Sequence, residues 1–245
     1  KVGRTHLEDA VPMTVEQEID AWASALYRTV NLLKKANEEL LELPIGGTAL
    51  GTGITAHPRF QNEIVRQLGS ITRYPLKPAD YPAELISNMT TFSLLSSHLR
   101  QVAIDLTKIS QDLKLLNMGP HAGLAEYTLP EVEPGSSIMP GKVNPSIAEA
   151  IHMVAYQVMA CDHAVALGAQ AGQLQLNVMT PMILFNLNLA MKLLTNGIQM
   201  FREKCVDGIV INADRIKQLL EGSLVNATAL SPYFGYPVTA KLVHE

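Results

Sequence analysis

The sequence predicts an all-α protein, a bundle of long helices, and three observations support that fold class. Several stretches repeat apolar residues at steps of three, four and seven positions, which is the spacing of one helical face. No stretch alternates apolar and polar residues as a half-buried strand does. Of the 245 residues, 47% are hydrophobic and only 17% are charged. One chain can scarcely cover that much apolar helix surface, so we expect helices buried between subunits.

The first helix is expected from Thr14 to Leu43. Its apolar face consists of Ile19, Trp22, Leu26, Val30, Leu33 and Leu40. Thr14 followed by Gln17 fits a capping box, and Pro44 ends the helix. A run with four glycines from Gly46 to Gly53 comes next. It lacks the Lys-Ser/Thr ending of a phosphate-binding loop and no strand pattern precedes it, so we interpret it as a structural turn.

Later helices are expected over the ranges 57–71, 83–116, 146–169, 176–204 and 212–220. Those from Ser146 and Leu176 are apolar nearly all round, which indicates burial on every side. The second of these two contains amides that need hydrogen-bond partners, most simply on neighbouring helices: Asn177, Asn186, Asn188 and Asn196. We expect a central helical domain over 1–222 and the start of a small second domain over 223–245, with an irregular, proline-rich tail.

Composition excludes several classes of function. A net charge of −4, from 19 basic and 23 acidic residues, gives no electrostatic basis for binding nucleic acid. No uninterrupted apolar segment of membrane-spanning length occurs, so no membrane partner is expected. Cys161 and Cys205 lie far apart and fit buried thiols of a reducing compartment, hence a cytoplasmic location. The histidines are scattered, and no spacing resembles a ligand set, so we expect neither a metal nor a cofactor.

One segment concentrates the functional groups: Gly-Ser-Ser-Ile-Met-Pro-Gly-Lys-Val-Asn-Pro, from Gly135 to Pro145. Its glycines and prolines keep it out of regular structure, while its side chains offer two hydroxyls, an ammonium and a carboxamide. Pro145 and Ser146 then open a helix whose first N–H groups are free to face an anion. A polar crossover between helices is the alternative, and the order and spacing of the residues argue against it.

This segment resembles the signature loop of the fumarase/aspartase superfamily. The stretch GRTHLEDA, Gly3 to Ala10, is similar to GRTHLQDA of that family. The stretch AGQLQLNVM, Ala171 to Met179, is similar to the aspartase form AGQLxLNVM, whereas fumarases usually have SGNFELNVF. The resemblance runs through the whole chain. It departs from the family at Glu8, Thr55 and His121, where Gln, Asn and Arg are usual.

The resemblance implies an ammonia-lyase that converts L-aspartate into fumarate. Ser136 would be the base that takes the Cβ proton, which leaves an enediolate (aci-carboxylate) intermediate. A serine hydroxyl is ordinarily too weak an acid to ionise at neutral pH, so elementary chemistry alone favours His6 as the base. The family instead implies that His6, paired with Glu149, binds or orients water or substrate. A lone histidine is also often merely structural.

The remaining implied roles concern substrate binding. Thr5 would hydrogen-bond a substrate carboxylate, and Ser137, Lys142 and Asn144 supply fixed donors where negative charge develops. The fold would be a homotetrameric helical core with active sites shared between subunits. We expect the chain to be a fragment that lacks the N-terminal domain and most of the C-terminal domain, and to be inactive alone. The alternatives are a class II fumarate hydratase and a catalytically silent helical scaffold.

Overall fold

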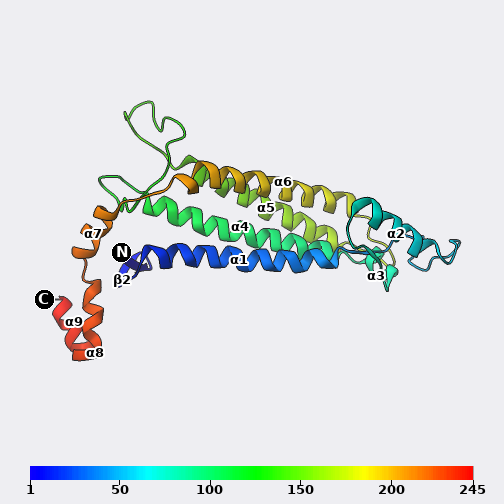
Figure 1. Cartoon of the computed structure of the whole chain (residues 1–245), viewed down its shortest axis with the longest axis horizontal. Helices are drawn as coiled ribbons and strands as arrows, with labels where there is room; N and C mark the ends of the chain where they lie inside the picture. The colour runs from blue at the N-terminus through cyan, green and yellow to red at the C-terminus, as the bar shows by residue number, and fades with distance from the viewer. Residues whose placement is uncertain (245) are drawn as a thin grey trace. The chain divides into compact units, whose positions relative to one another are not determined.

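The computed structural model describes residues Lys1 to His244 and confirms the all-α fold class (Figure 1). Its helices are α1 (Val15–Glu39), α2 (Phe60–Thr72), α3 (Pro82–Ser87), α4 (Thr90–Leu116), α5 (Ser146–Gln170), α6 (Thr180–Lys204), α7 (Ala213–Glu221), α8 (Ser231–Phe234) and α9 (Tyr236–His244). Short 3₁₀ turns lie at η1 (Val206–Gly208) and η2 (Val225–Leu230). None of the described helices is apolar over enough of its length to cross a membrane.

Short strands pair into two-stranded sheets. The antiparallel pairs are β1 (Val2–Thr5) with β2 (Glu8–Pro12) and β5 (Tyr127–Thr128) with β6 (Val210–Ile211). A parallel pair joins β3 (Glu42–Leu43) to β4 (Lys77–Pro78). These short strands were not predicted from the sequence. The β1–β2 hairpin escaped notice because it shows no apolar–polar alternation: its buried positions, Val2 and Gly3, are consecutive, and β2 is exposed except at half-buried Ala10.

The chain divides into two compact units. The first contains Lys1–Ala25, Ile109–Glu149 and the residues from Met200 onward, and the second contains Leu26–Lys108 and Ala150–Gln199. The predicted domain boundary after residue 222 concerns a different division of the chain and stays a prediction. Beyond it, the expected irregular tail is helical in the described residues, as η2, α8 and α9.

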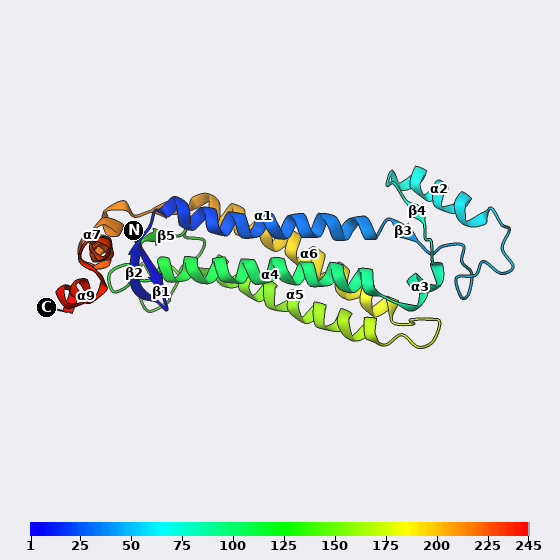
Figure 2. The same ribbon diagram turned by 90° about the horizontal axis from the view of Figure 1, so that it is seen from below.

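The second unit is a helical bundle, in which segments of α1, α4, α5 and α6 lie side by side (Figures 1 and 2). On α5 and α6 its core includes residues spaced three, four or seven apart: Ile151, Ala155, Val158, Val165, Ile183, Leu187, Ala190 and Leu194. This spacing is that of coiled-coil packing. Gly168 faces Ile183 and Gly197 faces Ile151, so α5 and α6 run antiparallel. The Arg100 guanidinium donates to Asp162 across α4 and α5 at 2.9 Å.

Helices α5 and α6 each bury only one stripe of residues within the chain. The opposite faces expose large apolar side chains: Met153, Tyr156, Leu167, Leu184, Phe185 and Ile198. A single chain thus leaves these faces uncovered, as expected from the amount of apolar helix surface. Burial of those faces between subunits stays a prediction.

Helix boundaries follow local signals except where a distant partner intervenes. The capping box at α1 is confirmed: the Gln17 N–H donates to Thr14 Oγ1 and the Thr14 N–H to Gln17 Oε1, both at 3.0 Å. The helix ends at Glu39 rather than Leu43 because Glu42 and Leu43 pair with β4 instead.

The helix expected over 83–116 is broken into α3 and α4, because Asn88 is extended, with φ −110° and ψ 143°. The helix expected from Leu176 starts only at Thr180. Asn177, in the turn before this helix, is buried. Its Nδ2 donates to the Gly168 carbonyl at 3.0 Å, and its Oδ1 accepts from the Met179 N–H at 2.9 Å. The predicted interhelical role of this amide is confirmed. Asn186, in contrast, donates to a carbonyl of its own helix.

Candidate active site

The signature loop is the part of the chain immediately before α5 (Figure 1, in green). Two hydrogen bonds close its base: the Gly135 N–H donates to the Lys142 carbonyl, and Asn144 Nδ2 donates to the Gly135 carbonyl, both at 2.9 Å. Between these bonds, the side chains of Ser136, Ser137 and Lys142 are exposed. The loop is therefore a closed frame that presents its hydroxyls and its ammonium to the outside.

Ser136 has a specific environment within this frame. Its Oγ accepts hydrogen bonds from the Ile138 N–H at 3.1 Å and the Met139 N–H at 3.0 Å. Two N–H donors directed at one hydroxyl oxygen stabilise negative charge on that oxygen. The sequence did not identify these two backbone donors, because they reach Ser136 only when the loop folds back on itself.

The hairpin β1–β2 carries two more of the predicted residues, Thr5 and His6. Thr5 and Glu8 face each other at the end of the ladder, and His6 and Leu7 form the two-residue turn. Both turn residues have left-handed backbone angles, with φ of 58° and 65°. A turn with positive φ at both central positions matches the twist of a hairpin but normally uses Asn or Gly. Thr5 and His6 are exposed at this tip.

All seven predicted site residues belong to the first unit. Within the described residues, no hydrogen bond or ion pair joins His6 to Glu149. The Glu149 carboxylate instead lies 3.9 Å from Lys114 Nζ on α4, and these side chains are 49% and 34% exposed. Sequence reasoning missed Lys114, whose position in the last turn of α4 carries no motif. The His6–Glu149 pair stays a prediction.

Beneath the hairpin lies a cluster that sequence reasoning also missed. Glu126 is fully buried, with its Oε1 2.7 Å from Arg4 Nη1 and its Oε2 2.9 Å from Lys1 Nζ. Lys1 Nζ also lies 2.6 Å from Glu18 of α1, whose other oxygen accepts from the Tyr127 hydroxyl at 2.6 Å. Burial, followed by the hydrogen bond to Glu18, raises the pKa of Tyr127 above its ordinary value.

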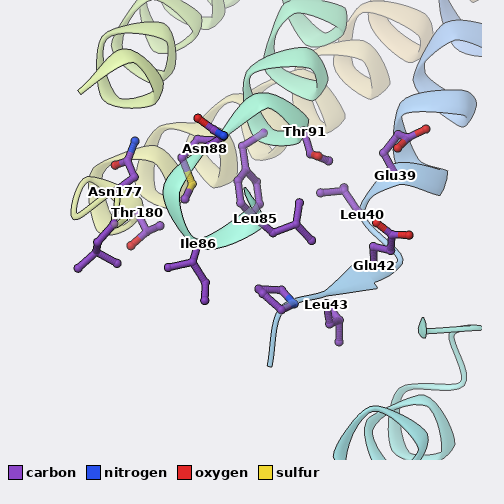
Figure 3. Close-up of a pocket in the computed structure, with 14 residues that line it drawn as sticks. Glu39, Leu40, Glu42, Leu43, Leu85, Ile86, Asn88, Thr91, Asn177 and Thr180 are labelled. Carbon is purple, nitrogen blue, oxygen red and sulfur yellow. The ribbon is translucent and has the colours of Figure 1, made fainter. Parts of the chain in front are cut away.

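A cavity of about 510 Å³ lies apart from these residues, in the second unit (Figure 3). Its wall is mostly apolar, with Leu40, Leu43, Leu85 and Ile86 among the lining residues, and Glu39 and Glu42 come from the α1–β3 side. None of the predicted site residues lines it. In the described part of the chain, no three His, Cys, Asp or Glu side chains gather closely enough to hold a metal ion.

Comparison with known proteins relates this chain to lyases. Residues 1–160 match a protein-family model described as Lyase. The chain is 46% identical, over 99% of its length, to an aspartate ammonia-lyase from Pseudomonas aeruginosa, of which it covers 51%. It is 45% identical, over its whole length, to a class II fumarate hydratase from Prochlorococcus marinus, of which it covers 52%.

A solved structure shows the same fold. The crystal structure of the class II fumarase from Schistosoma mansoni matches all of this chain, and 54% of its own, with a TM-score of 0.94 and 38% identity. The chain thus spans about half the length of the curated relatives it matches.

Proposed function

Because this chain belongs to the Lyase family and to the fumarase/aspartase superfamily of lyases, we propose that the protein is an aspartate ammonia-lyase. It eliminates ammonia from L-aspartate to give fumarate. The relatives include both aspartate ammonia-lyases and fumarate hydratases at similar identity, so the choice between the two substrates rests on the residues of this chain.

The observation that carries the choice is the turn between α5 and α6. Its sequence, with Gln173, Leu174 and Met179, matches the aspartase form rather than the fumarase form. The turn is tightly built: Gln173 and Leu176 exchange backbone hydrogen bonds at 3.1 and 3.3 Å, and buried Asn177 anchors it. Leu174 is 89% exposed on it. A turn held by these hydrogen bonds presents the side chains of Gln173 and Leu174 outward. Such a turn is suited to shaping a pocket for a leaving group.

In the proposed reaction Ser136, as the alkoxide, takes a proton from Cβ of aspartate. The electron pair of that C–H bond moves into the adjacent carboxylate, which becomes a doubly ionised enediolate. When the enediolate collapses, the Cα–Cβ double bond forms and the C–N bond breaks, with its electron pair leaving on ammonia. The N–H groups of Ile138 and Met139 support the base role, because they stabilise charge on the Ser136 oxygen.

Fixed donors stabilise the enediolate. Ser137, Lys142 and Asn144 belong to the loop, and the N-terminus of α5 follows it directly. Such groups are most effective when water is excluded, so closure of the loop over bound substrate forms part of the proposal. Thr5 binds a substrate carboxylate, and His6, paired with Glu149, orients substrate at the same centre.

We also propose that the active protein is a homotetramer, with active sites shared between subunits. The exposed apolar faces of α5 and α6 support this assembly, since Phe185 is 67% exposed and Met153 65%. In such a homotetramer, His6 of one subunit can lie next to Glu149 of another.

The test compares fumarate formation by the complete protein from L-aspartate and from L-malate. We expect the kcat/KM for aspartate to exceed that for malate by about 100-fold or more, because a site built for one polar group rejects another. Turnover of malate alone would show that the protein is a fumarate hydratase and not an aspartate ammonia-lyase. Absence of turnover with both would favour the silent scaffold.

A matched variant sharpens this test. Replacing Gln173→Asn together with Leu174→Phe gives the turn the Asn-Phe pair of the fumarase form and should reduce the preference for aspartate. An unchanged ratio would remove the turn from the choice of substrate.

A further inference from the structure

Buried charges hold the base of the β1–β2 hairpin, beside the buried apolar residue Val2. Glu126 has no exposed surface, the Lys1 side chain is 1% exposed and that of Arg4 is 15% exposed. The two cations approach different oxygens of the one carboxylate, at 2.9 Å for Lys1 and 2.7 Å for Arg4. Among the described residues, Oε2 of Glu126 has the Lys1 ion pair and no hydrogen bond. A buried charge of this kind is costly unless its partners stay in place.

This cluster joins segments far apart in the sequence. Arg4 lies within β1, whereas Glu126 directly precedes β5, 122 positions later. The backbone of Glu126 is itself fixed, because its carbonyl accepts from the Asn212 N–H at 2.9 Å. Nine residues after Glu126 the signature loop begins at Gly135. The carboxylate therefore ties the hairpin to the same strand that leads into the loop.

The hairpin needs such a tie because its own turn is strained. His6 and Leu7 hold left-handed backbone angles that cost non-glycine residues about 1–2 kcal/mol each. The turn residues are exposed, Leu7 by 73%, so little packing at the tip offsets that cost. Strain of this sort persists only where the surroundings impose it. The ladder and the charges below it are what impose it here.

We propose that Glu126 is a positioning residue for the reaction: through Arg4 and Lys1 it fixes the hairpin so that the turn presents Thr5 and His6 in their working geometry. Glu126 does not touch substrate. Its effect on turnover passes through the hairpin. This inference rests on the proposed function, because it assigns the hairpin tip to the substrate site.

The chain supplies a matched control for a purely structural role. Asp162 on α5 is also a buried carboxylate with an arginine partner, Arg100, at 2.9 Å. It lies in the second unit and contacts no predicted site residue. If buried ion pairs matter only for folding, Glu126→Gln and Asp162→Asn will affect turnover alike.

The experiment measures kinetics and amide hydrogen exchange on the complete, assembled protein. For Glu126→Gln we expect exchange of the amides in residues 2–12 to rise, and kcat/KM to fall by about tenfold or more, since small misplacements of reacting groups are costly. Asp162→Asn should leave hairpin exchange unchanged and kcat/KM within about twofold. Should Glu126→Gln not assemble, Glu126→Asp keeps the charge, shortens its reach and should give the same pattern at smaller size.

Three results would overturn the inference: unchanged hairpin exchange in the Glu126 variant, a kcat/KM within twofold of the unaltered protein, or an equal loss in Asp162→Asn. Failure of the proposed function is recognised separately, since the unaltered protein would then turn over neither aspartate nor malate. In that case the exchange data still decide whether Glu126 holds the hairpin.

Discussion

The two segments that carry six of the seven predicted site residues, all except Glu149 on α5, are held in opposite ways. The β1–β2 hairpin rests on a buried cluster of opposite charges, in which Glu126 has no exposed surface. The signature loop is closed at its base by two hydrogen bonds, its other hydrogen bonds link residues within the loop, and its functional hydroxyls and ammonium are exposed. A fixed tip and a loop with few anchors suit different tasks. The hairpin provides a template for substrate, and the loop can adjust its position when substrate binds.

The largest expected effect comes from the loop. Ser136→Ala should lower kcat by about 10²–10⁴-fold, the usual contribution of a positioned base. It should leave the free energy of unfolding within about 1 kcal/mol, because the side chain is exposed. Steady-state kinetics and urea unfolding of the same preparation measure both quantities. Turnover within tenfold of the unaltered protein would remove Ser136 from the base role.

Two glycines allow a direct comparison of the segments. A Cβ at Gly3 in the hairpin would lie 2.6 Å from the Val11 carbonyl oxygen and 3.2 Å from Met13 Sδ. A Cβ at Gly141 in the loop would have no atom within 4 Å, and only its φ of 74° opposes a side chain. Gly3→Ala should therefore cost about 2–3 kcal/mol of folding free energy, and Gly141→Ala about 1 kcal/mol. Urea unfolding checks this, and equal losses would contradict the contrast.

The hairpin base should also respond to alkaline pH. Burial and the neighbouring Glu18 carboxylate raise the pKa of Tyr127, so the folded protein favours the neutral phenol. That stability is complete below the ordinary tyrosine pKa of about 10 and is lost as the pH rises beyond it.

Tyr127→Phe tests this directly. It should cost about 1 kcal/mol at pH 8, through the lost hydrogen bond, and should flatten the decline above pH 10. Urea unfolding across this pH range provides the measurement. An identical decline in the variant would assign the effect to other groups.

The smallest expected effect concerns the strained turn. Leu7 has φ of 65° and is 73% exposed, so Leu7→Gly removes backbone strain and little packing. Because glycine also gains freedom in the unfolded chain, the net stabilisation should be about 0.5 kcal/mol. Thermal unfolding measures the change. A loss of stability would mean that the hydrophobic side chain, and not the backbone, determines the cost of this turn.

Much of the fold could be predicted from the sequence, because long helices depend on neighbours three and four residues away. The capping box of Thr14 and Gln17 and the extent of α5 from Ser146 are of this kind. The break at Asn88 and the late start of α6 were missed. Both depend on the Asn177 segment, where the side-chain amide binds Gly168 and the backbone N–H donates to the Ile86 carbonyl.

The sequence by itself determined the helical class and the identity of the residues in the signature loop and the hairpin turn, because periodicity and motif are local properties. Only the tertiary structure decided what holds those residues. The donors to Ser136 depend on a loop folded back on itself, and the partner of Arg4 is 122 positions away. A carboxylate that pairs across such a distance leaves no periodic trace. The cations that neutralise Glu126, Lys1 and Arg4, can be identified only in the folded chain, which brings them next to its carboxylate.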